Sequence, residues 1–371
     1  MTDNTSLRQQ VIAALESASE RLGKTRVVVG FDGFVDTILH VVKTRQSASE
    51  YSRMEKMSEF AQRIAEAAGQ SANLEMVAQM QKLGGNGPIM ANALGAFGMG
   101  VTYVGNLGYP AIHPVFAEFS KRAKVHSIAE PGYTDAIEFD DGKLMFGKHQ
   151  SLKEVNWENL LSHVPEGELV QIFGESQFVA IVNWTMLTQM KGILSELSAR
   201  IAPKLGGERR LIFFDLADPA KRSVADIREV LCQISGFEKH FRVILGMNFS
   251  ESQQVAAALG LSGVKETPEA VEALAVHIRQ KMQIDSAVIH PTHFAAAADE
   301  AGSACVEGPF CAKPKITTGA GDHFNAGFSL GRILGAGLAQ SLQLGVATSG
   351  FYVRNAASPS VSDLGGFLAS L

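Results

Sequence analysis

Apolar residues along the chain follow two different spacings, and the alternation between them predicts an α/β protein. Short continuous apolar runs, such as residues 26–32 and 210–214, are typical of strands buried on both faces of a parallel sheet. Apolar positions three or four residues apart, as in 324–334 and 338–353, indicate amphipathic helices. From residue 101 onward the two kinds of segment alternate, which predicts a doubly wound, mainly parallel sheet with helices on both faces. The other strand candidates are 101–104, 178–182, 242–245 and 287–289.

Segments outside this alternation predict a second, smaller sheet. Strand-like pieces at 37–43 and 74–81 flank an amphipathic helix near 54–68. A hairpin is predicted at 135–146, where Asp141-Gly142 marks a tight turn. Together with the two strand-like pieces, we expect this hairpin to form a small separate sheet.

The patterns divide the chain into three parts. Apolar residues within 6–22 predict an amphipathic helix ahead of the first strand. We therefore expect an N-terminal helical extension at 1–24, a large α/β domain at 25–36 and 84–371, and a small-sheet unit at 37–83 and about 132–148.

Composition and charge exclude several classes of function. Of the 371 residues, 46% are hydrophobic and 19% are charged, which is ordinary for a globular protein. The net charge of −5 argues against nucleic acid as a main partner. No apolar run reaches about 18 residues, and the first residues carry an acidic side chain where a signal peptide carries basic ones, so we expect a cytoplasmic protein with no membrane partner. Three cysteines without zinc-site spacing are expected to be small buried thiols: Cys232, Cys305 and Cys311.

The candidate chemistry centres on residues 317–328, with the sequence TTGAGDHFNAGF. The run Gly319-Ala320-Gly321 leaves the backbone nearly free of side chains, and helical spacing follows it, so a loop enters a helix here. The first N–H groups of a helix lack intrahelical partners and lie at the positive end of its dipole, so this loop is suited to hold an anion. Asp322 adds one carboxylate at the mouth of the loop. An anion site beside one proton acceptor is what phosphoryl transfer to an alcohol requires, whereas the alternative role for Asp322 is that of a helix cap.

Two common nucleotide-binding motifs fail at their diagnostic positions. A dinucleotide fold needs G-x-G-x-x-G after its first strand, but this chain has only Gly30 and Gly33, followed by a second strand-like run. A P-loop ending at Gly23-Lys24-Thr25 lacks its earlier glycine, because Ala18 occupies that position. The sequence therefore predicts neither a Rossmann dehydrogenase nor a P-loop protein.

Residues 318–328 resemble the C-terminal signature of the PfkB/ribokinase family of carbohydrate kinases. Residues 83–98, with the sequence LGGNGPIMANALGAFG, resemble the N-terminal signature of the same family, and the resemblance covers about 27–359. Members of this family have a ribokinase-like α/β fold with a small β-sheet lid over the substrate. The resemblance therefore implies that 37–83 and about 132–148 form a substrate lid, here with a helical insertion.

The resemblance also assigns catalytic roles. In the family, the Asp of the C-terminal signature is the catalytic base, and the backbone of its Gly-Ala-Gly run is an anion hole. These roles fall on Asp322 and on the three residues Gly319, Ala320 and Gly321.

Substrate contacts are predicted at the end of the first strand and at the N-terminal signature. In the family, a carboxylate after the first strand binds substrate hydroxyls, which points to Asp36; Asp32 is a second candidate that equally suits a turn-capping role. A carboxylate that accepts from sugar hydroxyls forms charge-assisted bonds worth roughly 1.5–3 kcal/mol each. The predicted substrate-binding residues are Asp36, Asp32, Gly84, Gly85 and Asn86.

Residues 246–251, with the sequence GMNFSE, contain the N-x-x-E motif that the family associates with magnesium and phosphate. Because Mg²⁺ prefers oxygen ligands and keeps several waters, Glu251 is predicted to hold it indirectly, through water. Asn-x-x-Glu is also a helix capping box, and the two roles are compatible. The predicted nucleotide-side residues are Asn248, Glu251, Thr318 and Asn325.

The sequence thus predicts a phosphotransferase that moves the ATP γ-phosphoryl group to a primary hydroxyl of a sugar or sugar derivative, with Mg²⁺ as cofactor. The alternatives are a nucleoside kinase or an ADP-dependent sugar kinase of the same superfamily, and, in another class, a sugar-binding regulator without catalysis. A homodimer through the lid is a further expectation. Several family members bind a monovalent ion with an Asp six residues before the base, but Ile316 stands there in this chain, so we expect little dependence on potassium.

Overall fold

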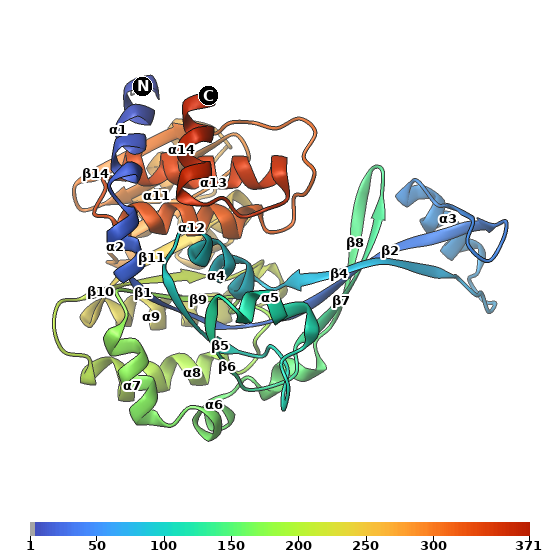
Figure 1. Ribbon diagram of the computed structural model, residues 1–371, viewed down its shortest axis with the longest axis horizontal. Helices are drawn as coiled ribbons and strands as arrows, with labels where there is room; N and C mark the ends of the chain where they lie inside the picture. Colours follow the sequence, from blue (N-terminus) through green and yellow to red (C-terminus); the bar gives the residue numbers. More distant parts are fainter. Residues whose placement is uncertain (1–3) are drawn as a thin grey trace.

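The protein is described here from a computed structural model, which describes residues 4–371. Its main body is built on a nine-stranded sheet in the order β14-β13-β12-β11-β10-β9-β1-β5-β6 (Figure 1). The strands from β12 to β6 run parallel, whereas β13 and β14 are antiparallel additions at one edge. The strands of this sheet are β1 (Arg26–Phe31), β5 (Gly100–Gly105), β6 (Ala123–Ser127), β9 (Phe178–Val182), β10 (Arg210–Asp215), β11 (Phe241–Met247), β12 (Ser286–Ile289), β13 (Phe294–Asp299) and β14 (Gly302–Glu307).

Helices cover both faces of this sheet, so each face has its own hydrophobic core. Neighbouring residues of β1 show the division, because Val28 belongs to one core while Val27 and Val29 belong to the other. One core is covered by α6 (Trp157–His163), α7 (Glu166–Glu175), α8 (Met190–Glu196), α9 (Val224–Gly236), α10 (Phe249–Ala258) and α11 (Pro268–Met282). The other is covered by α1 (Asn4–Glu16), α2 (Ser19–Lys24), α4 (Asn86–Ala96), α5 (Ala117–Ser120), α12 (Ala320–Ile333), α13 (Leu338–Asn355) and α14 (Val361–Ser370).

A second sheet of five strands projects to one side of the body (Figure 1). Its central strand is β2 (Phe34–Arg45), which follows β1 almost directly and pairs with three other strands. The helix α3 (Met57–Glu66) contributes Phe60 to a small core against this sheet. We call β2, β3, β4, β7, β8 and α3 the projecting sheet; its other strands are β3 (Tyr51–Arg53), β4 (Met76–Gly84), β7 (Gly132–Phe139) and β8 (Gly142–Lys148).

The predicted fold class is confirmed: the body is a doubly wound, mainly parallel sheet, and a smaller sheet accompanies it. Two local predictions were wrong. The single helix expected within 6–22 is broken into α1 and α2, because turn residues separate the two helices around Ala18. The cysteines are not a buried set, since Cys232 is exposed and the other two are partly exposed. No helix in the described part of the chain is long and apolar enough to span a membrane.

Candidate active site

The two signature segments of the sequence meet in space at the N-termini of α4 and α12, which pack against each other (Figure 1). Gly319 precedes α12 with a φ of 92°, a left-handed conformation that favours glycine. Asn86 is the first residue of α4, and its side-chain Nδ2 donates a hydrogen bond to Oδ1 of Asp322 at 2.9 Å. Residues 236 positions apart in the sequence thereby form one site.

Asp322 lies in the first turn of α12 and is only 7% exposed. Burial raises the pKa of its carboxyl well above the usual range, and the negative charge of Asp215 raises it further, whereas the hydrogen bond from Asn86 lowers it. A carboxylate with a raised pKa is a stronger proton acceptor than an exposed one. Asp322 is therefore suited to act as a general base.

Backbone N–H groups beside Asp322 are free to bind an anion. The N–H of Ala320 donates to the carbonyl of Thr317 at 3.1 Å, and that of His323 donates to the carbonyl of Gly319. Among residues 4–371, no backbone carbonyl accepts from the N–H of Gly321 or of Asp322. These two donors, at the positive end of the α12 dipole, are the ones that the loop offers to a phosphate.

Asp32 and Asp36, the two substrate candidates, lie in different environments. Asp32 is fully buried at the end of β1, and burial raises its pKa to about 6. Its two carboxylate oxygens accept from the N–H of Asn86 at 2.9 Å, from the N–H of Gly87 at 2.8 Å and from Nδ2 of Asn183 at 2.7 Å. Because two of these donors are the first backbone N–H groups of α4, Asp32 anchors the N-terminus of α4 to the body.

Asp36 lies on β2, where the projecting sheet leaves the body. It is 4% exposed; burial raises its pKa, whereas Lys82 and a hydrogen bond with Thr134 lower it. Gly84 lies against its side chain, and a Cβ at this position would lie 2.5 Å from the carboxylate. The glycine therefore leaves the room that the Asp36 carboxylate occupies. Neither Lys82 nor Thr134 was predicted, because only strand register brings them to Asp36.

A cavity of about 400 Å³ lies against the loop, and Thr317, Ala320 and Gly321 are among the residues that line it. Its wall is largely apolar, and a few polar groups, among them Asn248 and Thr317, lie near the loop. The remaining predicted residue of the loop, Thr318, accepts a hydrogen bond from the Tyr352 hydroxyl through its carbonyl at 2.9 Å. A largely apolar cavity beside an anion-binding loop has the character expected of a nucleotide site.

The N-x-x-E motif forms the predicted capping box. Oδ1 of Asn248 accepts from the N–H of Glu251 at 2.9 Å, and Oε2 of Glu251 accepts from the N–H of Asn248 at 2.8 Å. The other oxygen of Glu251 accepts from the N–H of Asp218. Asn325 is fully buried, and its Nδ2 donates to Asp215 at 2.7 Å, so it supports the site from within α12.

The neighbouring carboxylates of Asp215, Glu251 and Asp322 suit a cation that is held through water. In the described residues, no three His, Cys, Asp or Glu side chains are arranged to bind a metal ion directly. Burial and the charge of Asp215 raise the pKa of Glu251 to about 8, and Glu251 and Asp215 in turn raise that of Asp322. A divalent cation beside these carboxylates would reduce their mutual repulsion, and oxygen-rich surroundings fit Mg²⁺ with most of its waters retained.

The site as a whole has an acceptor side and a donor side. Asp36 lies on the projecting sheet, Ala320 and Gly321 line the cavity, and Asp322 follows them in the first turn of α12. Burial raises the pKa of the Tyr352 hydroxyl, and the negative charges of Asp322 and Asp36 raise it further. This arrangement can transfer an anionic group from a ligand in the cavity to a hydroxyl group held near Asp36.

Comparison with known proteins identifies relatives along the whole chain. The family model described as prokaryotic ketohexokinase matches residues 2–370. The ketohexokinase of Haloferax volcanii is 30% identical over 367 residues, which cover 98% of this chain and 96% of that protein.

Solved structures show the same fold at lower identity. Ribokinase of Arabidopsis thaliana, complexed with ribose and ATP, superposes with a TM-score of 0.64 at 16% identity and covers 93% of this chain and 98% of its own. Phosphofructokinase-2 of Escherichia coli, in complex with substrates and products, gives a TM-score of 0.65 at 15% identity and covers 94% and 99%.

Proposed function

The chain belongs to the prokaryotic ketohexokinase family and is thus a carbohydrate kinase, and we propose that it transfers the γ-phosphoryl group of ATP to a primary hydroxyl group of a ketohexose. The observation that carries this proposal is the position of Asp322. It is a buried carboxylate with a raised pKa, next to two unpaired N–H groups, and it directly follows Ala320 and Gly321, which line the cavity.

In the proposed reaction, Asp322 takes the proton from the attacking hydroxyl group. The N–H groups of Gly321 and Asp322 stabilise the negative charge that spreads over the transferring phosphoryl group. General-base catalysis of this kind contributes about 10²–10⁴-fold to the rate. Asn86 holds the carboxylate in place through its 2.9 Å hydrogen bond.

The acceptor sugar is proposed to lie between Asp36 and Asp322, covered by the projecting sheet as a lid. Closure of such a lid would exclude water, which otherwise competes with the sugar as phosphoryl acceptor. Hydrogen exchange in 37–83 and 132–148 should slow together when a ketohexose is added. Equal protection with and without the sugar would mean that this sheet is a static structure.

The nucleotide is proposed to occupy the cavity with its phosphates at the loop. The apolar wall suits a base, and Asn248, Glu251, Thr318 and Asn325 build or support the phosphate end. When bound, Mg²⁺ would neutralise charge on the donor phosphates, and Glu251 is placed to hold it through water. A homodimer through the projecting sheet is also proposed, since Met145 and Phe146 on this sheet are 46% and 49% exposed.

The proposal is tested by incubating the enzyme with Mg²⁺, one nucleotide and one acceptor, and by following the phosphorylated product with ³¹P NMR. The acceptors are fructose, glucose, ribose and adenosine, and each is tried with ATP and with ADP. We expect fructose with ATP to give the largest kcat/KM. A preference for adenosine would instead support a nucleoside kinase, and a preference for ADP would support an ADP-dependent sugar kinase. The D322N variant serves as the control for contaminating kinases.

A further inference from the structure

The carbonyl groups of two consecutive loop residues each accept a hydrogen bond from a ring side chain. Nδ1 of His323, in the first turn of α12, lies 2.7 Å from the carbonyl oxygen of Gly319. The hydroxyl group of Tyr352, on α13, donates to the carbonyl of Thr318 at 2.9 Å. Because these two carbonyls come just before the unpaired N–H groups of the loop in the chain, both bonds act on the segment that forms the anion site.

The rings of His323 and Tyr352 support each other. They stack with their centroids 3.6 Å apart and their planes 14° apart, and both side chains are buried. They come from different helices, α12 and α13, which pack against each other (Figure 1). Because a buried ring in close contact with another cannot turn without displacing it, the pair holds both carbonyls as one unit.

Hydrogen bonds at its second nitrogen fix the orientation of the His323 ring. A carbonyl oxygen only accepts, so Nδ1 of His323 carries the ring proton and Nε2 is an acceptor. Nε2 lies 2.9 Å from Oγ of Ser358, and Nδ2 of Asn92 donates to the same Oγ at 3.0 Å. The hydroxyl proton of Ser358 is therefore directed to Nε2. Burial lowers the pKa of His323 to about 4, so the ring stays neutral near pH 7 and keeps this arrangement.

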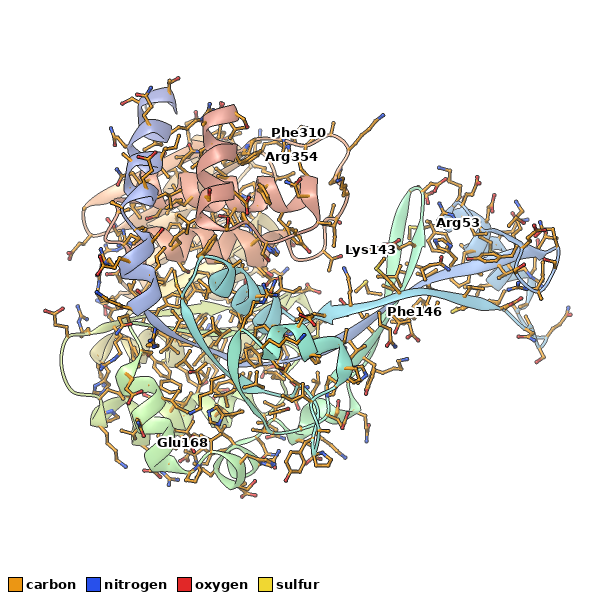
Figure 2. The ribbon with its side chains drawn as sticks, in the orientation of Figure 1. Arg53, Lys143, Phe146, Glu168, Phe310 and Arg354 are labelled. Atoms are coloured by element: carbon orange, nitrogen blue, oxygen red, sulfur yellow. The ribbon has the colours of Figure 1, made fainter. Side chains whose placement is uncertain are left out.

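The last turn of α13 also holds the segment that leads into the loop. Nη2 of Arg354 donates to the carbonyl of Phe310 at 2.8 Å, and the two residues lie next to each other in Figure 2. The N–H of Lys315 donates to the carbonyl of Val353 at 2.8 Å. Together with Tyr352, three consecutive residues of one helix therefore fasten the chain at 310, 315 and 318.

The loop needs this support because glycine has little conformational preference of its own. Gly319 has a φ of 92°, and a Cβ at this position would lie 3.1 Å from the Tyr352 hydroxyl oxygen, so a larger residue fits poorly here. The carbonyl and the N–H of a trans peptide group point in opposite directions, so the bond from His323 to the Gly319 carbonyl also directs the N–H of Ala320. That N–H closes the turn by donating to the carbonyl of Thr317 at 3.1 Å.

Neither ring is placed to act on a nucleotide directly. Among the described residues, those that line the cavity beside the loop do not include His323 or Tyr352. The proton on Nδ1 of His323 and the hydroxyl proton of Tyr352 are both used by loop carbonyls. The raised pKa of Tyr352 keeps its hydroxyl group protonated, and therefore a donor, beside the carboxylates of the site. Any effect of the two rings on the reaction must pass through the backbone of the loop.

We propose that His323 and Tyr352 are positioning residues for phosphoryl transfer, an inference that rests on the function proposed above. As a stacked pair they hold the two loop carbonyls, and they thereby keep the N–H groups of Gly321 and Asp322 aligned with the transferring phosphoryl group. Donors that are aligned in advance stabilise the transition state more than the bound substrates. Loosening the loop therefore lowers the rate of transfer and leaves the KM values for nucleotide and acceptor nearly unchanged.

The test uses three variants and one matched control. Y352F removes only the hydroxyl group and keeps the stacked ring, whereas H323F keeps a ring but removes both nitrogens. H323N is the conservative variant, because the amide of Asn can place a donor near the position of Nδ1. The control is F351L: Phe351 precedes Tyr352 on α13, but its ring contacts Phe367 of α14.

The measurements are the single-turnover rate of transfer from ATP to fructose at saturating substrates, the KM for each substrate, and the melting temperature. We expect the transfer rate to fall about 10–100-fold in Y352F and H323F, less than the 10²–10³-fold typical for complete removal of one anion-hole donor. Both KM values should stay within about threefold of those of the parent enzyme. H323N should recover most of the rate that H323F loses, and F351L should leave the rate unchanged.

The outcomes separate this inference from the proposed function. A parent-like transfer rate in folded Y352F and H323F, or a raised KM for ATP with an unchanged rate, would overturn the positioning role and leave the kinase proposal intact. Equal losses in H323N and H323F would overturn the role of the bond to Gly319. If H323F does not fold, Y352F and H323N decide. A parent enzyme that phosphorylates another acceptor but not fructose would contradict the ketohexose proposal, and the same comparison with that acceptor would still test the two rings.

Discussion

Nδ2 of Asn86 donates a hydrogen bond to Oδ1 of Asp322 at 2.9 Å, and this contact joins the first turns of α4 and α12. The same first turn of α4 is held by Asp32 from the end of β1. One body-anchored helix therefore positions the carboxylate proposed as the base. The consequence is that Asn86 influences both the position and the proton affinity of Asp322.

Replacing Asn86 by Ala should shift the pH dependence of the reaction. The hydrogen bond from Asn86 favours the ionised carboxylate, so its loss raises the pKa of Asp322 further. The base acts only when ionised, so the reaction rate increases as the pH rises through this pKa. A higher pKa moves that increase to higher pH. We expect the acid limb of kcat/KM to move upward, with a larger loss of activity at low pH than at high pH.

The matched control for this prediction is Asn92→Ala. Asn92 is on the same helix, but its Nδ2 bonds to Ser358 and not to Asp322. Its pH profile should keep the parent shape. Parallel profiles for parent and N86A would show that Asn86 does not set the proton affinity of the base.

Asp36 and Asp32 should respond differently to replacement by Ala. Asp36→Ala should raise KM for the sugar more than KM for ATP, since its carboxylate lies at the acceptor side. Asp32→Ala leaves the N–H groups of Asn86 and Gly87 and Nδ2 of Asn183 without their buried acceptor, at a cost of about 1–3 kcal/mol each. We therefore expect a lower melting temperature for D32A. A fully stable D32A enzyme with a raised sugar KM would reverse the two assignments.

The fold could be predicted from the sequence wherever the burial of a strand or helix shows in the local spacing of its apolar residues. Strands such as β9, with all five residues buried, are continuous apolar runs and were identified directly. The strands β6, β13 and β14 were missed for a physical reason. β13 reads FAAAAD and β14 reads GSACVE, so both consist largely of residues with low strand propensity, and their pairing at the sheet edge decides their structure.

The residues of the site also differ in whether the sequence alone could identify their roles. Asp322 and its loop were predicted because their signal is local: a glycine-rich run, a carboxylate and a helix. The different roles of Asp32 and Asp36 depend on contacts between distant residues, such as that of Asp32 with Asn183, which is 151 positions away. Lys82 was missed because only the register of β2 with β4 brings it opposite Asp36.

Potassium should change turnover little. Ile316 offers no oxygen ligand, which leaves main-chain carbonyls and Ser360, and Ser360 already caps α14 through two hydrogen bonds with Asp363. The measurement is the initial rate at saturating donor and Mg²⁺, with potassium chloride compared with tetramethylammonium chloride at equal ionic strength. A potassium-specific rise of about tenfold or more would show that other groups build a monovalent-ion site.

The most direct test of the central claim is the single-turnover rate of phosphoryl transfer to fructose in the D322N variant, with ATP and fructose binding measured in parallel by calorimetry. Asn keeps the shape of the side chain but cannot accept the proton, so we expect both ligands to bind and the transfer rate to fall by about 10²–10⁴-fold. A transfer rate within a few-fold of that of the parent enzyme would contradict the assignment of Asp322 as the catalytic base.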